Sequence, residues 1–263
     1  MMHFVRRFGV RIFAVVVVMI AIYGVTSFYS AYYREQRIGK LIEDGGGDVA
    51  FAHFEPGWLA PVLPPGFPYY ARITRARLRI TDPTITTIDQ DYVDSFIKSD
   101  RVIDGLSMLR HLQQLDLNNT GIEGRRLTFI RHLPNLETLS LGFTRTDDPL
   151  LAELGGLSNL QSLRLNHTQI SNDGLAHLKQ MSQLKELYLG GTAIGDAGLK
   201  HLSGLSNLEE LDLRGTQITD AGLDQLKPLV NLKRLYLANS QVTLEGRAQI
   251  RKALPNRLMT EDR

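Results

Sequence analysis

The stretch that decides the fold runs from Leu208 to Ile218 and reads LEELDLRGTQI. Its two central leucines, Leu211 and Leu213, are separated by one charged residue and flanked by two more. Successive side chains of a strand point to opposite faces, so this alternation puts both leucines on one face and the charged side chains on the other. The stretch therefore predicts a short strand that is buried on one side only.

The same pattern recurs every 24 residues without a gap. Because each unit leaves its leucines half covered, only stacking on the next unit completes their burial, and the strands must join in one parallel sheet. A threonine or serine follows each strand and is interpreted as a structural turn residue. The columns that share this spacing are Leu115, Leu139, Leu163, Leu187, Leu211 and Leu235; Leu117, Leu141, Leu165, Leu189, Leu213 and Leu237; and Thr120, Thr144, Thr168, Thr192, Thr216 and Ser240.

A return segment follows each turn. In the segment after Thr216, Thr219 and Asp220 are interpreted as capping residues at a helix amino terminus, and Leu223 and Leu226 lie at positions i and i+3 of that helix. The sequence therefore predicts short helices that run back along the outer face of the sheet.

Residues 208–218 match the pattern L-x-x-L-x-L-x-x-N/C-x-L, with Thr216 at the asparagine position. The unit resembles the ribonuclease-inhibitor-like leucine-rich repeats, and its T-x-I-T-D-A-G-L turn is similar to that of bacterial proteins with an amino-terminal membrane anchor. The resemblance covers residues 72–254 and implies an α/β solenoid with a parallel sheet on the concave face and short helices on the convex face. It also implies binding of proteins or peptides on the concave sheet, with no shared catalytic residues and no cofactor.

The two ends of the repeat array are less regular. Ala76, Leu78 and Thr81 reproduce a strand and turn, but 39 residues separate Ala76 from Leu115, which places an insertion at residues 84–99. The repeats are assigned to residues 72–246 and a carboxyl-terminal cap and tail to residues 247–263. In that cap Arg247, Arg251 and Lys252 are expected to form a basic outer face, and residues 257–263 are expected to fray.

The amino terminus carries an uncharged stretch from Ile12 to Phe28. Tyrosines that follow it extend the segment to about the 20 residues that a bilayer core requires. We expect a tail at residues 1–11 and a transmembrane signal anchor at residues 12–33; a cleaved signal peptide is the alternative. Basic residues balance on the two sides, and the short tail favours a single-pass cell-membrane protein with its repeats on the non-cytoplasmic side.

Residues 34–71 are assigned to a linker and an amino-terminal cap. Three glycines, Gly45 to Gly47, end any helix there. Prolines and aromatic residues crowd the following segment, and Trp58 is interpreted as a cap anchor that covers the exposed edge of the first repeat.

Composition excludes several kinds of site. The net charge is only +2, with basic and acidic residues mixed along the repeats, so no nucleic-acid footprint is present. Without cysteine there is neither a thiolate nucleophile nor a cysteine-ligated metal. His177 and His201 share a repeat position, but no third ligand recurs with them, so no metal site is predicted. Enzymatic activity is not expected.

The outward-pointing strand residues are the candidate binding face, because the repeat fixes their positions while the core does not require their identities. Tyr188 and Tyr236 are expected about 10 Å apart with Asp212 between them. Tyrosine and arginine are enriched in binding hot spots. The alternative is an ordinary solvated sheet face. The candidate residues are Asp116, Arg164, Glu186, Tyr188, Glu210, Asp212, Arg214, Arg234 and Tyr236.

Three functions remain open from the sequence. The first is a membrane-anchored module that binds a protein or peptide across the concave sheet. The second is an intracellular substrate adaptor, because F-box adaptors carry similar turns, although no F-box lies upstream. The third is a structural repeat protein without a specific ligand. The identity of the partner is not encoded in any pattern described above.

Overall fold

The computed structural model describes residues 36–37, 40, 43, 48–54, 70–77, 106–107, 109–254 and 259–261. The predicted transmembrane segment at residues 12–33, Trp58 and the insertion at residues 84–99 lie outside these ranges. Among the described residues, none of the helices combines the length and the apolar character that crossing a membrane requires. The anchor therefore stays a prediction.

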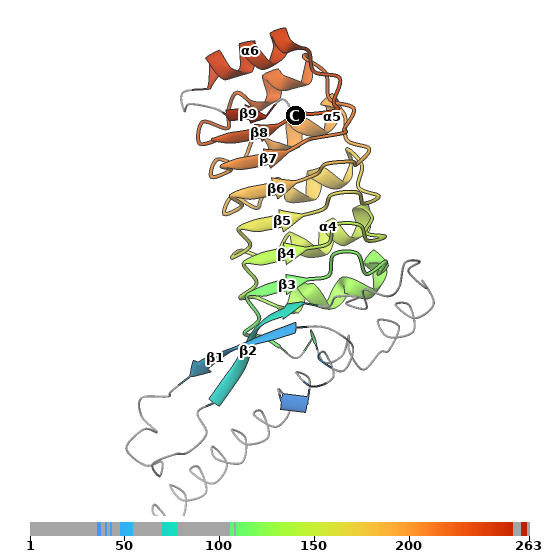
Figure 1. Cartoon of the computed structure of the whole chain (residues 1–263), viewed down its shortest axis with the longest axis vertical. Coiled ribbons are helices and arrows are strands. Elements are labelled where there is room, and N and C mark those ends of the chain that lie inside the picture. The colour runs from blue at the N-terminus through green and yellow to red at the C-terminus, as the bar shows by residue number, and fades with distance from the viewer. Residues whose placement is uncertain are drawn as a thin grey trace, which may run out of the picture.

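Nine strands form one sheet in chain order (Figure 1). The first two, β1 (Asp48–Phe54) and β2 (Tyr70–Arg77), are antiparallel, and every later strand is parallel to its neighbour. The parallel strands are β3 (Gln114–Asp116), β4 (Thr138–Ser140), β5 (Ser162–Arg164), β6 (Glu186–Tyr188), β7 (Glu210–Asp212), β8 (Arg234–Tyr236) and β9 (Met259–Glu261).

The register of the sheet confirms the 24-residue period. Leu115 pairs with Leu139, and the same leucine column continues strand by strand to Leu235 on β8. At the amino-terminal end Ala76 pairs with Leu115, as the irregular alignment predicts in spite of its 39-residue spacing. The antiparallel strand β1 then forms the edge of the sheet.

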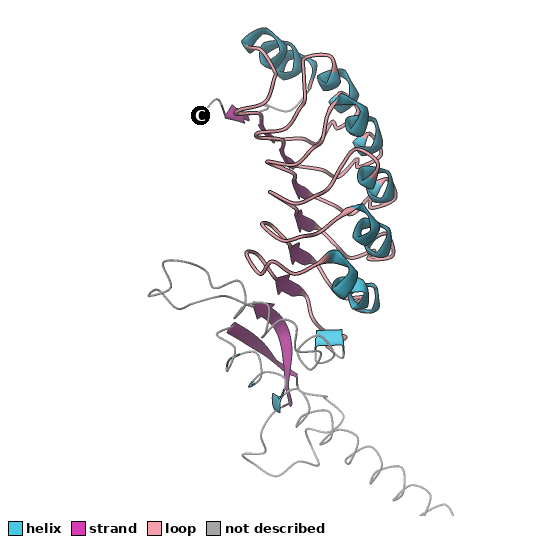
Figure 2. Ribbon diagram, turned by 90° about the vertical axis from the view of Figure 1, so that its right-hand side faces the viewer, coloured by secondary structure: helices cyan, strands magenta, loops and turns pink. Residues whose placement is uncertain are grey.

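The return segments lie on the outer side of a curved stack, and the strands line its inner side (Figure 2). The short helices that the sequence predicts are present, and four of the seven in the described part of the chain are 3-10 helices. The segments are η1 (Gly124–His132), α4 (Asp148–Leu154), η2 (Gly174–Leu178), α5 (Asp196–Leu199), η3 (Lys200–Leu202), η4 (Gly222–Leu226) and α6 (Leu244–Ala253). A 3-10 helix rises about 2.0 Å per residue against about 1.5 Å for an α-helix, so it returns the chain with fewer residues.

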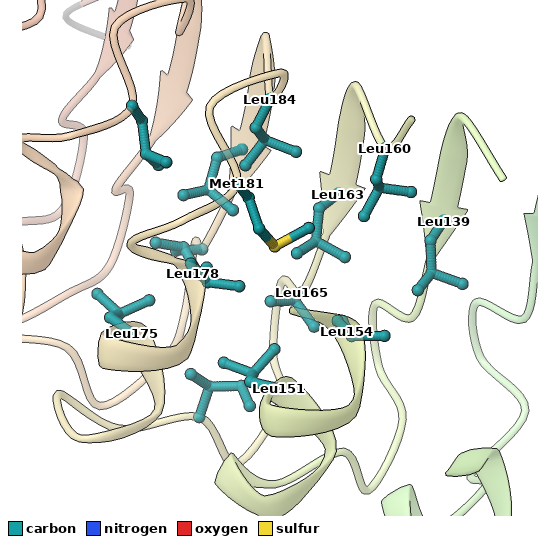
Figure 3. Close-up of a cluster of buried hydrophobic side chains, with 14 of the residues drawn as sticks. Leu139, Leu151, Leu154, Leu160, Leu163, Leu165, Leu175, Leu178, Met181 and Leu184 are labelled. Carbon is teal, nitrogen blue, oxygen red and sulfur yellow. The ribbon is translucent and has the colours of Figure 1, made fainter. Parts of the chain in front are cut away.

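The leucine columns form one continuous core between the strands and the return segments. Buried apolar side chains run from Leu106 to Leu254 as a single cluster. Figure 3 shows Leu139 and Leu163 pointing from adjacent strands toward Leu151 and Leu154 of α4. Each repeat therefore shares its buried side chains with both neighbours, which is why an isolated unit would not be stable.

Acidic side chains in the turns bind the following repeat instead of capping their own helix. Asp196 accepts two hydrogen bonds from Thr219, at 2.8 Å from the backbone nitrogen and 2.6 Å from the hydroxyl. Asp220 makes the same pair of bonds to Thr243, and η4 has no side-chain cap. The interpretation of Asp220 as a helix cap is therefore wrong, because its carboxylate is engaged 23 residues further along the chain.

A glycine is required opposite each of these carboxylates. A Cβ placed on Gly222 would lie 2.1 Å from Asp196 Oδ1, and one on Gly246 would lie 2.1 Å from Asp220 Oδ1. Each of these two glycines thus allows close approach of the preceding repeat. We call this combination of aspartate, hydroxyl and glycine the turn clamp.

A second set of hydrogen bonds between repeats lies at the opposite ends of the strands. Four asparagines spaced by multiples of 24 residues each donate from Nδ2 to a backbone carbonyl of the preceding repeat at 2.8 Å: Asn135 to Arg110, Asn159 to Pro134, Asn207 to Ser182 and Asn231 to Ser206. Gln183 holds the remaining position. The threonine column, in contrast, bonds within its own repeat, as Thr216 Oγ1 does to the carbonyl of Leu213 at 2.6 Å. The interpretation of that column as structural agrees with this geometry.

The residue before each of these threonines adopts a left-handed backbone. Glycine occupies the position at Gly191 and Gly215, whereas Phe143 (φ +57°) and His167 (φ +53°) adopt it with a full side chain. The two rings stack with centroids 4.4 Å apart, and the Phe143 side chain is exposed. A bulky residue in this region is an uncommon source of backbone strain.

The carboxyl-terminal end differs from expectation in two respects. Residues 259–261 do not fray, because β9 pairs in parallel with β8. Arg247 does not join Arg251 and Lys252 on an exposed surface; it is half-buried and donates to the carbonyl of Leu237 at 3.1 Å. The helix α6 that carries it is capped by Thr243, which accepts from the backbone nitrogen of Gly246.

Candidate binding face

The concave face consists of the strand side chains that point away from the leucine core, together with the residues three positions beyond each strand's central leucine. The register places Tyr188, Asp212 and Tyr236 in one row across β6, β7 and β8, as the sequence predicts. The row below it contains Glu186, Glu210 and Arg234. Because adjacent strands lie about 4.8 Å apart, neighbouring side chains within one row lie close together.

Glu210 is the centre of the network on this face. Its Oε1 accepts hydrogen bonds from the hydroxyls of Tyr188 at 2.9 Å and Tyr236 at 3.0 Å. Its Oε2 is paired with the guanidinium of Arg234. Only 8% of the Glu210 side chain is exposed, so this carboxylate is held beneath its three donors.

The electrostatics follow from this arrangement. Burial raises the pKa of Glu210, but hydrogen bonds from Arg234, Tyr188 and Tyr236 outweigh it and leave the pKa below its ordinary value. Burial, the hydrogen bond to Glu210 and the charge of Glu186 raise the pKa of Tyr188 well above its ordinary value. The carboxylate is therefore ionised and the phenol protonated at neutral pH, which keeps the donor and acceptor roles fixed.

Asp212 forms a second buried acceptor. Arg214 donates to it from Nε at 2.9 Å and Nη2 at 2.8 Å, which is the bidentate geometry that suits a carboxylate. Asn166 donates from Nδ2 to Asp212 Oδ2 at 3.0 Å, across the intervening strand. Gly190 makes this reach possible, because a Cβ there would lie 2.9 Å from Asn166 Nδ2.

Two arginines lie over tyrosine rings. The guanidinium carbon of Arg164 is 4.6 Å from the centroid of Tyr188, and that of Arg214 is 5.2 Å from the centroid of Tyr236. Contacts of this kind hold a long side chain in one place and attract the cation to the ring face. The arginines are thus the exposed layer of the face, and the carboxylates of Glu210 and Asp212 lie below them.

Eight of the nine predicted residues belong to this one connected network, which spans β5 to β8. Glu186 joins it through Ser162, whose hydroxyl donates at 2.8 Å, and through the hydroxyl of Tyr188 at 3.5 Å. Asp116 accepts from the backbone nitrogen of Asn118 at 3.1 Å and lies on β3, outside the range of strands from β5 to β8 that the other eight residues occupy.

The prediction missed Asn166 and Ser162 as members of the network. The signal for Asn166 was Gly190, since a glycine next to a strand can mark close approach of another group, and a Cβ there would lie 2.9 Å from Asn166 Nδ2. Ser162 had no comparable signal. At Gly142 a Cβ would lie 2.9 Å from Asn118 Oδ1, which accepts from the Gly142 backbone nitrogen at 2.6 Å in the adjacent repeat.

Comparison with known proteins identifies the repeat. A leucine-rich-repeat family model matches residues 182–242, and a second leucine-rich-repeat model matches residues 156–178. No curated protein matches the chain. Two solved structures from Listeria monocytogenes are similar. Internalin C2 is 27% identical, with a TM-score of 0.49 over 60% of this chain and 65% of that one. A second internalin, inlF, is 22% identical, with a TM-score of 0.39 over 60% of this chain and 56% of the other. The chain thus spans less than two thirds of either structure.

Proposed function

We propose, from the premise that this chain is a leucine-rich-repeat protein, that its concave face binds a protein or peptide partner without catalysis. The proposal extends to an anchor at residues 12–33 that holds the repeats on the non-cytoplasmic side of a membrane. Leucine-rich-repeat domains in general mediate protein–protein interaction, which supports the first part. The uncharged stretch from Ile12 to Phe28 supports the second.

The observation that carries the binding proposal is the fixed arrangement of arginine and tyrosine side chains on β5 to β8. Tyr188 and Tyr236 are both tied to Glu210, and Arg214 is tied to Asp212. Side chains already held in one conformation lose little entropy when a partner docks. Arginine and tyrosine also contribute disproportionately to binding energy at interfaces. This face is therefore better prepared for a partner than a solvated polar sheet would be.

The test is selection of a random 12-residue peptide library on the full chain, followed by affinity measurements on the selected peptides. The variant Tyr188→Ala/Tyr236→Ala removes both rings from the face. We expect it to weaken the selected peptides at least about tenfold, because each aromatic anchor contributes on the order of 1–2 kcal/mol. Thermal unfolding is recorded in parallel to show that the repeats remain folded.

The matched control replaces two exposed lysines on the outer side, Lys179→Ala/Lys200→Ala. It should leave every affinity within about twofold, since exposed charges outside an interface contribute little. Peptides that lose affinity with the outer-side variant and not with the tyrosine variant would locate binding on the helices and overturn the proposal.

A separate experiment addresses the anchor. Protease added to intact cells is expected to digest the repeats, because the proposed orientation leaves them outside. Protection of the repeats in intact cells, with digestion after lysis, would reject this orientation and favour the intracellular adaptor instead.

A further inference from the structure

Three arginines form the exposed layer of the concave face, and one of them differs from the other two. Arg214 is paired with Asp212 and Arg234 with Glu210. Among the described residues no carboxylate pairs with Arg164, and its guanidinium lies over the ring of Tyr188. Arg164 is also exposed. It thus presents a positive charge that no side chain of the described repeats neutralises.

The residues around Arg164 fix the position of its guanidinium and leave its N–H donors free to bind a ligand. Tyr188, on which it lies, is fixed by hydrogen bonds to Glu210 at 2.9 Å and Glu186 at 3.5 Å. A guanidinium stacked on a ring still presents its five N–H donors around its edge. These donors are the groups that bind a carboxylate in a bidentate manner.

The residue on the other side of Arg164 adds a further donor. Ser140 lies opposite Arg164 in the register of β4 and β5. Its hydroxyl makes no hydrogen bond to any other described residue, although the residue is only 6% exposed. With strands about 4.8 Å apart, Ser140 adjoins Arg164 on β4, and the guanidinium lies over Tyr188 on the other side, on β6. At Gly142, two residues beyond Ser140, the backbone nitrogen donates to Asn118 Oδ1 at 2.6 Å, so the Asn118 side chain lies beside that position.

We propose that Arg164, with Ser140 beside it, is the recognition point for an aspartate or glutamate side chain of a peptide lying across β4 to β6. This inference rests on the proposed function and specifies the chemistry of its partner. The site offers one unpaired positive charge, and the carboxylates of Glu186 and Glu210 adjoin Tyr188. A singly charged carboxylate matches that charge, whereas a doubly charged phosphate would be repelled by the adjoining carboxylates.

The test uses the peptides selected on the full chain. Each peptide that contains an acidic residue is synthesised in three forms: the acid, the matching amide (Gln or Asn), and phosphoserine at the same position. Affinities are measured for the wild type, Arg164→Gln and Arg131→Gln. Arg131 is the control because it is an arginine on η1, on the outer side of the repeats, and pairs with the partly exposed Glu153.

We expect the wild type to bind the acid about tenfold more tightly than the amide, as a charge-assisted hydrogen bond allows. Arg164→Gln should abolish this preference and leave the affinity of the amide form unchanged, while Arg131→Gln should retain the preference in full. Arg164→Lys should retain part of it, because the charge remains and the planar fork is lost. Arg164→Gln leaves no buried group without its partner, so loss of folding does not compete as an explanation for a lost acid preference.

The outcomes that overturn the inference are distinct from those that overturn the proposed function. An acid preference that survives Arg164→Gln, tighter binding of phosphoserine through Arg164, or selected peptides without acidic residues would each reject the acidic ligand. In these cases the tyrosine variant still tests the concave face. Peptides insensitive to Tyr188→Ala/Tyr236→Ala would reject the face itself and, with it, the role of Arg164.

Discussion

Replacing Gly222 with alanine is expected to destabilise the fold by about 2 kcal/mol through the turn clamp. The new Cβ would lie 2.1 Å from Oδ1, 2.7 Å from Cγ and 3.1 Å from Cβ of Asp196. The carboxylate must therefore rotate away from Gly222. In doing so it gives up both hydrogen bonds to Thr219, at 2.8 Å and 2.6 Å, which join two successive repeats.

The magnitude combines two opposing effects. Hydrogen bonds to a charged group contribute about 1.5–3 kcal/mol each, and the lower end applies here because Asp196 is only half-buried and water can replace its donors. Loss of both bonds then costs about 3 kcal/mol. Alanine recovers up to about 1 kcal/mol over glycine in a helical segment. The net loss of about 2 kcal/mol is well above the error of a denaturation experiment.

Urea unfolding followed by circular dichroism measures this loss, with Gly156→Ala as the control because nothing lies within 4 Å of a Cβ at Gly156. A double-mutant cycle identifies the cause. In an Asp196→Ala background the carboxylate is absent, so Gly222→Ala should cost less than about 1 kcal/mol there. Equal costs of Gly222→Ala in both backgrounds, or a loss no larger than that of Gly156→Ala, would refute the turn clamp.

Three further perturbations test other parts of the structure. Leu211→Ala is expected to cost about 2–5 kcal/mol in urea unfolding, because it leaves a cavity in the fully buried leucine column; a loss below about 1 kcal/mol would contradict a shared core. Glu210 has a folded-state pKa below its ordinary value of 4.5, so the stability it contributes is present above that pH and is lost as the pH falls through the lowered pKa. The difference in unfolding free energy between wild type and Glu210→Gln should accordingly narrow between about pH 6 and about pH 3, and a constant difference would reject the assignment of Glu210 as the network's ionised centre. Phe143→Asn should stabilise the fold by up to about 1 kcal/mol in thermal unfolding, since asparagine tolerates the left-handed backbone at this position, whereas Phe143→Ala keeps the strain, loses the stack on His167 and should destabilise it; the reverse order would show that the stack outweighs the strain.

The sequence predicts the fold well where a residue's role depends only on the face of the strand to which its side chain points. The leucine columns require only that one face of each strand be buried, and the register of the sheet follows from their spacing, even at Ala76. Prediction failed where a side chain had a choice of partners. Asp220 lies at the start of a helical segment, where a cap is the commonest role, yet its carboxylate reaches Thr243 in the next repeat. The partner of this carboxylate depends on the distance in space between stacked repeats, which the sequence of one repeat does not reveal.

The candidate site shows the same division. Period-two alternation identifies which side chains face outward, and eight of the nine candidates do form one network. It does not reveal which of them reach solvent. Glu210 and Asp212 are short enough to lie beneath the longer arginines, with Asp212 fully buried. These two residues therefore position the arginines and tyrosines, and they are not themselves the groups that a partner would contact.

The distribution of cross-strand contacts indicates where on the concave face a partner would insert its side chains. From β6 to β8 the face is filled by Tyr188, Glu210 and their donors, so an incoming group can only lie on top of them. On β4 the corresponding positions hold Thr138 and Ser140, which are smaller, and Ser140 is buried. Arg164 stands at the boundary between these two regions. A peptide that crosses the sheet would accordingly rest its backbone on the tyrosines and direct an acidic side chain toward β4.

Replacing Ser140 with a bulky residue should therefore block acidic peptides while leaving contacts over β7 and β8 intact, and an unchanged affinity for those peptides would place their acidic group elsewhere.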